Sequence, residues 1–115
     1  MQTNTYGKRS EIIAADYLKK KGYKILETNY KNLIGEIDII AKDGKTLVFI
    51  EVKTRLTRAF GDPLEAIDYK KQQKIRNVAT LYLKERKMLN ALSRFDAISI
   101  LGLENPEISH VTDAF

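Results

Sequence analysis

The chain has 115 residues, of which 43% are hydrophobic and 30% are charged, and this balance supports a packed core and argues against intrinsic disorder. It contains no cysteine and a single histidine, His110, so disulfides, thiolate metal sites and multi-histidine zinc sites within one chain are excluded. The net charge of +5 favours a polyanionic partner such as nucleic acid, although lysines on solvated helix faces explain a charge of this size equally well.

The sequence predicts one domain without a targeting or membrane segment. It has six glycines and only two prolines, and we find neither an internal repeat nor a low-complexity linker, so residues 1–115 are expected to form a single domain. The first residues lack the apolar core of a signal peptide, and no apolar run is long enough to span a bilayer. We therefore expect a cytoplasmic protein without a membrane partner.

The first half of the chain predicts a helix followed by three strands. A helix over about residues 5–21 has an apolar stripe that includes Ile13 and Leu18, and it ends in three lysines before Gly22, a natural helix terminator. A strand follows over roughly residues 23–30. A hairpin then occupies residues 35–55, with its turn at Asp43-Gly44, a dipeptide typical of tight hairpin turns.

The second half predicts a long helix and one or two further strands. Asp62 as N-cap, Pro63 at the first helical position and Glu65 in a capping box predict a helix from residue 62 to about residue 86. Residues 94–101 predict a fourth strand, and residues 108–115 a short last strand or tail. The resulting order, α-β-β-β-α-β-(β), indicates an α/β fold with a mixed central sheet flanked by helices. The third and fourth strands should be parallel, because a helix connects them.

The hairpin is unusual because ionisable residues interrupt its apolar strands, where charge is costly to bury. A loop of two or four residues centred on Asp43-Gly44 places Asp38 opposite Phe49 and Glu36 opposite Glu51, with all four side chains and Lys53 on one face. Asp38 and Glu51 are then diagonal neighbours, with Cα atoms about 7–8 Å apart. A loop of three or five residues would turn Asp38 to the opposite face. The other face carries the aliphatic residues expected to pack against a helix, namely Ile37, Ile39, Val48, Ile50 and Val52.

The converging acids of the hairpin predict a metal site. Two neighbouring carboxylates repel each other unless a cation compensates, and Mg²⁺, with Mn²⁺ as an alternative, prefers such oxygen ligands. We predict Asp38 and Glu51 as metal ligands, with the backbone carbonyl of Val52 as an additional one. Lys53 brings a positive charge to the same place, so the set suits phosphodiester hydrolysis, in which the metal activates water and the charges stabilise the phosphorane. The competing interpretation is an exposed sheet face with ordinary salt bridges.

Several other charged residues are candidates for supporting roles. Lys71 interrupts the apolar stripe formed by Ile67 and Ile75, so it either extends to solvent or reaches an anion at the sheet edge. Glu36 is a metal neighbour, a brace for Arg55, or part of a solvated rim. The residues predicted to contact phosphates are Lys45, Arg55, Arg58, Lys71 and Lys74.

Two further residues are expected to be structural. Asp96 shares a strand face with Ile98, and we favour its pairing with Arg94 over a role in supporting the metal site. His110 lies in an undistinguished C-terminal stretch.

The residues "GEIDIIA…LVFIEVKTR" closely resemble the YraN family of uncharacterised bacterial proteins and, more widely, the PD-(D/E)xK nuclease superfamily. "GYKILETNY", "FGDPLEAIDYKK", "RFD" and the final "AF" occur in the expected order, so the resemblance covers nearly the whole chain. It implies a restriction-endonuclease-like fold, close to the archaeal Holliday-junction resolvases, with Asp38, Glu51 and Lys53 as the metal and catalytic site. Some relatives add a glutamate from the first helix, which here is Glu11, and the resemblance also selects Lys71.

The sequence departs from the pattern of these families at three positions. Ile37 stands where the motif of the superfamily has proline, a change that the superfamily tolerates. Ser10 stands where glycine is expected, and Thr28 where a basic residue is expected.

The leading hypothesis is therefore a Mg²⁺-dependent endonuclease that hydrolyses phosphodiester bonds of DNA, with branched DNA among its substrates. By analogy with the resolvases, we expect a two-fold homodimer. A non-catalytic nucleic-acid-binding protein that retains the nuclease fold is the alternative. A third hypothesis is an interaction module that binds no nucleic acid.

Overall fold

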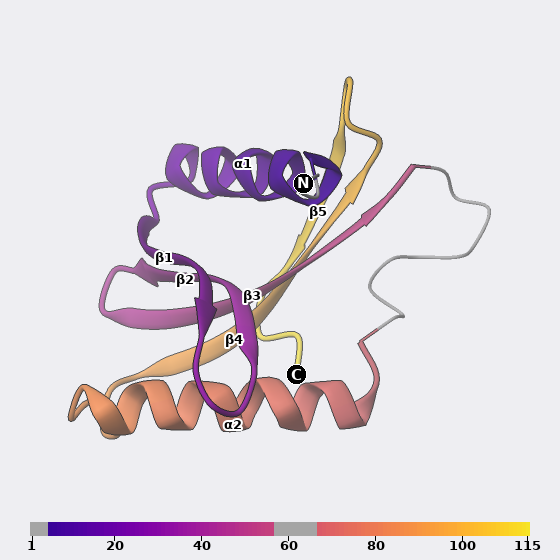
Figure 1. Cartoon of the computed structure of the whole chain (residues 1–115). Helices are drawn as coiled ribbons and strands as arrows, with labels where there is room; N and C mark the ends of the chain where they lie inside the picture. Colours follow the sequence, from indigo (N-terminus) through magenta and orange to yellow (C-terminus); the bar gives the residue numbers. More distant parts are fainter. Residues whose placement is uncertain (1–4, 57–66) are drawn as a thin grey trace.

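A computed structural model describes residues 5–56 and 67–115, with side chains from residue 7 onward. Within these ranges the elements follow in the order α1 (Thr5–Lys20), β1 (Lys24–Lys31), β2 (Glu36–Asp43), β3 (Thr46–Arg55), α2 (Tyr69–Glu85), β4 (Ser93–Leu101) and β5 (Glu107–Val111). Figure 1 shows α1 and α2 on opposite sides of the strands. The predicted α/β order is confirmed, and the C-terminal segment forms a strand.

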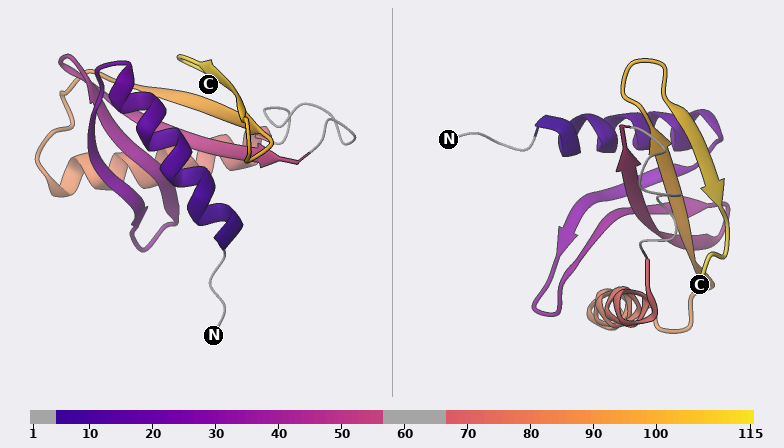
Figure 2. Two further views of the ribbon diagram at one scale, coloured as in Figure 1. Left: turned by 90° about the horizontal axis from the view of Figure 1, so that it is seen from above. Right: turned by 90° about the vertical axis from the view of Figure 1, so that its right-hand side faces the viewer.

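The five strands form one sheet in the order β1-β2-β3-β4-β5. Neighbouring strands are antiparallel except β3 and β4, which are parallel, as expected from the helix that connects them (Figure 2). The mixed sheet is thus confirmed. No helix in the described part of the chain is long and apolar enough to cross a membrane.

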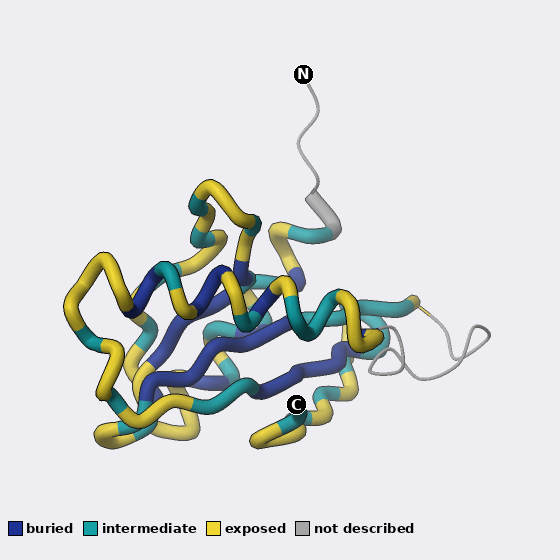
Figure 3. The backbone as a smooth tube through the Cα atoms, turned by 90° about the horizontal axis from the view of Figure 1, so that it is seen from below, coloured by how far each residue is buried: buried dark blue, intermediate teal, exposed yellow. Residues whose placement is uncertain are grey.

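Each helix covers a separate hydrophobic core on one face of the sheet. On the face of α1, Ala14 and Leu18 pack against strand residues that include Ile39, Val48, Ile50, Ile98 and Ile100. On the face of α2, buried helix residues pack against strand residues that include Ile40, Leu47 and Phe49. Figure 3 shows that buried positions gather on the central strands, while the helices alternate between buried and exposed positions. Polar residues on the α2 face of β3 therefore lie beneath a helix rather than on an open sheet.

The second helix begins later than predicted. Its N-cap is Asp68, which has extended backbone angles (φ −79°, ψ 175°) and a side-chain Oδ1 that accepts the Lys71 N–H at 2.8 Å. The predicted start at Asp62, Pro63 and Glu65 lies outside the described residues. Because residues 67 and 68 are not helical, the continuous helix predicted over residues 62–86 is wrong. Asp68 offers the capping chemistry predicted for Asp62, because an aspartate carboxylate at the N-cap can accept a backbone N–H of the first turn.

The β2–β3 turn has two residues, which is one of the two loop lengths considered from the sequence, but it comprises Gly44 and Lys45, so the predicted centre at Asp43-Gly44 is wrong by one residue. Gly44 has a φ of 62°, which suits the first position of a type II′ turn. Asp43 then pairs with Thr46 and Ile39 with Ile50, so the predicted pairing of Asp38 with Phe49 is wrong by two residues. A shift of two residues does not by itself move a side chain to the other face, because side chains alternate with a period of two.

Ile37 is the one aliphatic hairpin residue that packs on the other face from the one predicted. It is buried in the core beneath α2 rather than in the core beneath α1. The β2–β3 ladder ends at Ile39 and Ile50, whereas β1 and β2 stay paired beyond that point. The free end of the β1–β2 pair curls toward α2 (Figure 2), and this curl carries Ile37 with it.

Candidate functional site

Asp38 lies where β2 separates from β3. Its Oδ2 accepts the backbone N–H of Val52 at 2.7 Å. Val52 lies beyond the last paired residue of the β2–β3 ladder, so the carboxylate takes the place of a strand carbonyl. If the observed register is extended by one residue, Asp38 faces Glu51 directly instead of diagonally. The observed register therefore brings the two acids together.

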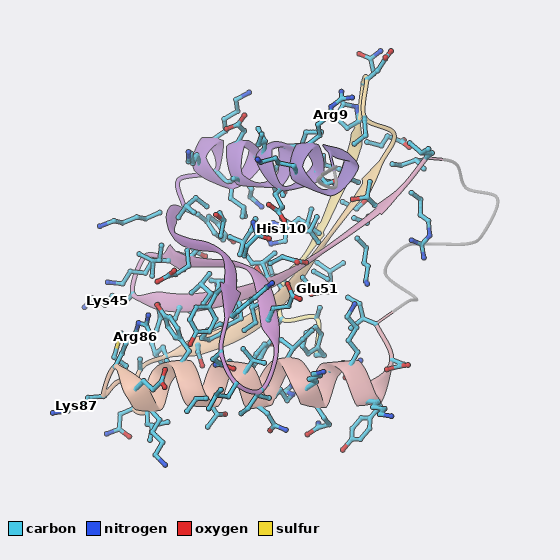
Figure 4. All side chains as sticks on the ribbon, in the orientation of Figure 1. Arg9, Lys45, Glu51, Arg86, Lys87 and His110 are labelled. Carbon is cyan, nitrogen blue, oxygen red and sulfur yellow. The ribbon has the colours of Figure 1, made fainter. Side chains whose placement is uncertain are left out.

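Glu51 is buried on β3 and is held by two lysines. Its Oε2 lies 2.7 Å from the Lys71 Nζ and 3.4 Å from the Lys53 Nζ. Lys53 comes from the same strand face, and Lys71 comes from the first turn of α2, where the Asp68 cap holds its backbone N–H. Figure 4 shows Glu51 between the sheet and α2. We call Asp38, Glu51, Lys53 and Lys71 the acid–lysine cluster.

The acid–lysine cluster perturbs the protonation of its members. Burial and the nearby Glu51 carboxylate raise the pKa of Asp38 from 3.8 to about 7, although the Val52 N–H opposes this rise. Burial also lowers the pKa of Lys53, and the neighbouring Lys71 adds to this effect. Burial opposes the charge of Lys71 most strongly, but its interactions with Glu51, Lys53 and Asp38 together outweigh burial and raise the pKa of Lys71. Strongly perturbed acids and lysines in a cleft are typical of functional sites.

A cavity of about 320 Å³ opens beside the two acids. This volume falls within the range of small-ligand sites. Its lining residues come from the β1–β2 turn, β2, β3 and α2, and they are Gly35, Glu36, Asp38, Glu51, Lys71, Lys74 and Ile75. The structure thus brings the predicted residues Glu36, Lys71 and Lys74 to the same cavity as the two acids.

Glu11 lies outside this cavity lining and contacts β1 instead. Its Oε1 accepts a hydrogen bond of 2.6 Å from the Asn29 Nδ2. Asn29 has a φ of 53° and lies between the residues that pair with Ile37 and Ile39, so it is the strand neighbour of Asp38. Asn29 was not predicted as a site residue; its one signal in the sequence is that asparagine tolerates positive φ better than most residues. Asn29 therefore lies between the Glu11 carboxylate and the position of Asp38 on β2.

The remaining predicted phosphate contacts are dispersed. Lys45 is exposed in the β2–β3 turn, at the other end of the hairpin from Glu51 (Figure 4). Arg55 follows Lys53 on the same strand face, and its Nη1 donates to the carbonyl of Thr54 at 3.1 Å. Arg58 lies outside the described residues. Among the members of the predicted set that the structure describes, only Lys71 and Lys74 line the cavity.

Asp96 belongs to a second buried network of hydrogen bonds and ion pairs. Its predicted pairing with Arg94 is confirmed. Its carboxylate is fully buried and bonds the Arg94 Nε at 3.0 Å, the His110 Nε2 at 2.8 Å and the Asp113 N–H at 3.0 Å. Burial alone would raise the pKa of Asp96, but these three partners outweigh it and lower that pKa. This network ties β5 and the C-terminal residues to β4, which is a structural role. The extent of the network was not apparent from the sequence, because its members are far apart in the chain.

Comparison with known proteins identifies the family of this chain. The family model described as "Uncharacterised protein family UPF0102" matches residues 10–100. The chain belongs to this family. A UPF0102 protein of Geotalea daltonii is 49% identical over 113 residues, which cover 96% of this chain and 89% of the relative. A UPF0102 protein of Alkaliphilus metalliredigens is 39% identical and covers 98% of this chain and 99% of the relative.

A third UPF0102 protein, from Caldanaerobacter subterraneus, is 47% identical and covers 96% of this chain and 94% of the relative. The resemblance to the YraN family, which is the family described as UPF0102, is thus confirmed, whereas the wider resemblance to the PD-(D/E)xK nuclease superfamily stays a prediction. All four members of the acid–lysine cluster lie within the residues that the UPF0102 family model matches.

Proposed function

We propose that this UPF0102 protein is a metal-dependent endonuclease that hydrolyses phosphodiester bonds of DNA. The observation that carries the proposal is the Asp38–Glu51 pair, drawn together at the strand split beside a cavity and faced by two lysines. Such a pair is costly to bury without compensation. A divalent cation bound by both carboxylates would remove the repulsion and place a Lewis acid next to basic side chains.

The donor atoms fit Mg²⁺, with Mn²⁺ as a substitute. Mg²⁺ is commonly held by one or two carboxylates together with waters and substrate phosphates, rather than by a complete protein cage. In the described residues no group of three or more histidine, cysteine, aspartate or glutamate side chains is placed to hold a metal ion, so Asp38 and Glu51 would need water and substrate oxygens to complete the coordination. Asp38 and Glu51 would hold the ion, with the Val52 carbonyl as a further ligand. When bound, the ion would activate water and polarise the phosphoryl group.

The lysines supply the remaining chemistry. Lys53 has a depressed pKa and lies beside Glu51, so it can donate or accept a proton and stabilise the developing phosphorane charge. A cation at Glu51 would compete with Lys71 for the carboxylate and free that lysine for a substrate phosphate. Lys74 lines the same cavity and would hold the phosphate backbone of the DNA. Such a contact would position the protein on the DNA without recognising the base sequence.

The resemblance to the resolvases supports two further parts of the proposal. A two-fold homodimer would present two such sites to opposed strands of a DNA substrate. A cytoplasmic location would give the enzyme access to that substrate. Arg55, and more distantly Lys45, would extend the phosphate contacts beyond the cavity.

A second candidate function is nucleic-acid binding without cleavage. One observation favours it: the Lys71 Nζ lies 2.7 Å from the Glu51 carboxylate and so already compensates part of the negative charge without a metal. A protein of this kind would bind DNA in a salt-dependent manner through the same lysines.

Cleavage of a labelled substrate panel separates the two candidates. The panel comprises single strands, flaps, duplex and four-way junctions, each incubated with Mg²⁺, Mn²⁺ or EDTA. Glu51→Gln and Lys53→Met should abolish metal-dependent cutting. Two matched controls carry the same changes at exposed positions outside the cavity lining, Glu104→Gln and Lys84→Met, and should cut like the wild type.

Two results of this panel would change the proposal. Cutting that survives Glu51→Gln and Lys53→Met would refute the site assignment. Salt-sensitive binding by a wild type that never cuts would select the non-catalytic candidate.

A further inference from the structure

The turn between β1 and β2 presents two apolar side chains beside the cavity. Leu33 is 100% exposed and Ile34 is 40% exposed. The next residues along the chain, Gly35 and Glu36, line the cavity itself. Single exposed leucines are ordinary on protein surfaces. The placement and the rigidity of this pair distinguish it from such leucines.

Asn32 holds the turn in one conformation. Its N–H donates to the Gly35 carbonyl at 2.9 Å, and its Oδ1 accepts the N–H groups of Ile34 at 3.0 Å and Gly35 at 3.4 Å. Its Nδ2 donates to the Val78 carbonyl of α2 at 3.1 Å. Figure 1 shows the turn reaching across to α2. Because the turn is already ordered, a ligand that covers Leu33 loses little affinity to ordering this segment.

Glycine at position 35 permits this close approach to the helix. A Cβ atom there would lie 3.0 Å from the Lys74 Cε and 3.2 Å from the Val78 Cγ2. The apolar pair is therefore fixed to the same helix that carries Lys71, and its position relative to the acid–lysine cluster is set by the fold.

The charges around the turn indicate a nucleic acid as the occupant. Lys31 is exposed immediately before the turn, and Lys74 is exposed on α2 against Gly35. Lys71 lies further along the cavity wall. An apolar tip of two residues among lysines is too small for a stable hydrophobic protein interface, but it suits a polyanion whose bases lie between its phosphates.

We propose that Leu33 and Ile34 insert between neighbouring bases of bound nucleic acid, next to the phosphate held at the acid–lysine cluster. This inference rests on the proposed function and names its substrate class. Leucine and isoleucine are among the side chains that proteins insert between base steps to unstack them. Unstacking costs least where pairing is already interrupted. The site should therefore prefer a bulge, a mismatch or a branch point over a continuous duplex.

Base unstacking can be measured directly with 2-aminopurine, which brightens when it leaves the stack. The probe duplex carries 2-aminopurine beside a one-nucleotide bulge, the reference duplex is fully paired, and Ca²⁺ replaces Mg²⁺ so that the strands stay intact. The test protein carries Leu33→Ser together with Ile34→Ser. The control is Leu92→Ser, a similarly exposed leucine (68%) after α2 and outside the cavity lining. Circular dichroism verifies that each variant is folded.

The wild type and the control should brighten the probe, and the double variant should not. Loss of buried leucine and isoleucine contacts should weaken binding to the bulged duplex by about tenfold. Binding to the fully paired duplex should change by less than about twofold, because these side chains would not insert there.

The outcomes separate this inference from the nuclease proposal. Brightening that depends on Leu33 and Ile34 supports insertion even if the wild type never cuts DNA. Cutting without brightening, or equal bulge binding by the double variant, overturns insertion and leaves the nuclease proposal standing. Failure to bind any nucleic acid overturns both. If the double variant instead alters the oligomeric mass of the free protein in sedimentation, the pair belongs to a protein interface and insertion is wrong.

Discussion

Replacement of Asp38 by asparagine should stabilise the metal-free protein at neutral and alkaline pH. In the folded state, burial and the nearby Glu51 raise the pKa of Asp38 from 3.8 to about 7. One pKa unit corresponds to about 1.4 kcal/mol, so keeping this carboxylate ionised at pH 8 reduces the free energy of unfolding by about 4 kcal/mol at most. Water that enters the open cavity reduces this penalty, and we expect about 2–4 kcal/mol. Asparagine has no charge to desolvate, and its side-chain oxygen can still accept the Val52 N–H.

The direction of the pH dependence follows from proton binding. Between about pH 4 and pH 7 the folded protein holds a proton on Asp38 that the unfolded chain has released. The stability of the wild type therefore falls as pH rises through this range, and it levels off above the folded pKa. The Asp38→Asn variant lacks this component, so the difference between the two proteins isolates the titration of Asp38 from that of every other group.

Urea unfolding in EDTA at pH 4, 6 and 8 measures this difference. The variant should be slightly more stable at pH 4 and about 2–4 kcal/mol more stable at pH 8. Asp16→Asn, at an exposed position on α1, serves as the control and should follow the wild type. Parallel stability curves for Asp38→Asn and the wild type would show that the acid pair carries no strain, and would remove the main physical reason for a metal at this place.

Three further predictions test the site and its surroundings. Added Mg²⁺ should raise the melting temperature of the wild type at pH 8, and Asp38→Asn or Glu51→Gln should remove most of that increase; an equal increase in all three proteins would place the ion elsewhere. Asp96→Asn or His110→Ala should reduce the free energy of unfolding by about 2–4 kcal/mol because each leaves buried partners unsatisfied, as urea unfolding at pH 7 can measure. Since the pKa of Asp96 is lowered, its stabilising contribution should disappear as pH falls below about 4, and a stability of the wild type that does not fall more steeply with acid than that of Asp96→Asn would contradict this assignment. Gly35→Ala should destabilise by about 1 kcal/mol because its Cβ meets α2, whereas a gain in stability would show that the turn can relax.

The acid–lysine cluster contributes unfavourable electrostatic free energy to the folded state. Asp38 accepts one hydrogen bond from the Val52 N–H but remains next to the Glu51 carboxylate. The charge of Glu51 is compensated by Lys53 of β3 and Lys71 of α2. Such an arrangement contributes less to stability than a hydrophobic pair would, which is the pattern expected where function rather than folding selects the residues.

Much of the fold could be predicted from the sequence because its signals are local. The alternation of apolar residues, the hairpin turn and the helix stripes predict the order of the elements and the mixed sheet. The period of two in a strand also places Asp38, Glu51 and Lys53 on one face, and this holds even though the predicted register is wrong by two residues. The residue types at the candidate site are likewise apparent from the sequence, since charges in apolar strands are rare.

The tertiary structure alone decided how these residues meet, because the deciding contacts join segments far apart in the chain. The separation of β2 from β3 lets the Asp38 carboxylate accept the Val52 N–H. The start of α2 at Tyr69 places Lys71 in the first turn of the helix, where its ammonium group contacts Glu51. The same curl of the β1–β2 pair buries Ile37 beneath α2. Local propensity cannot specify such contacts, since each depends on the packing of two or more elements at once.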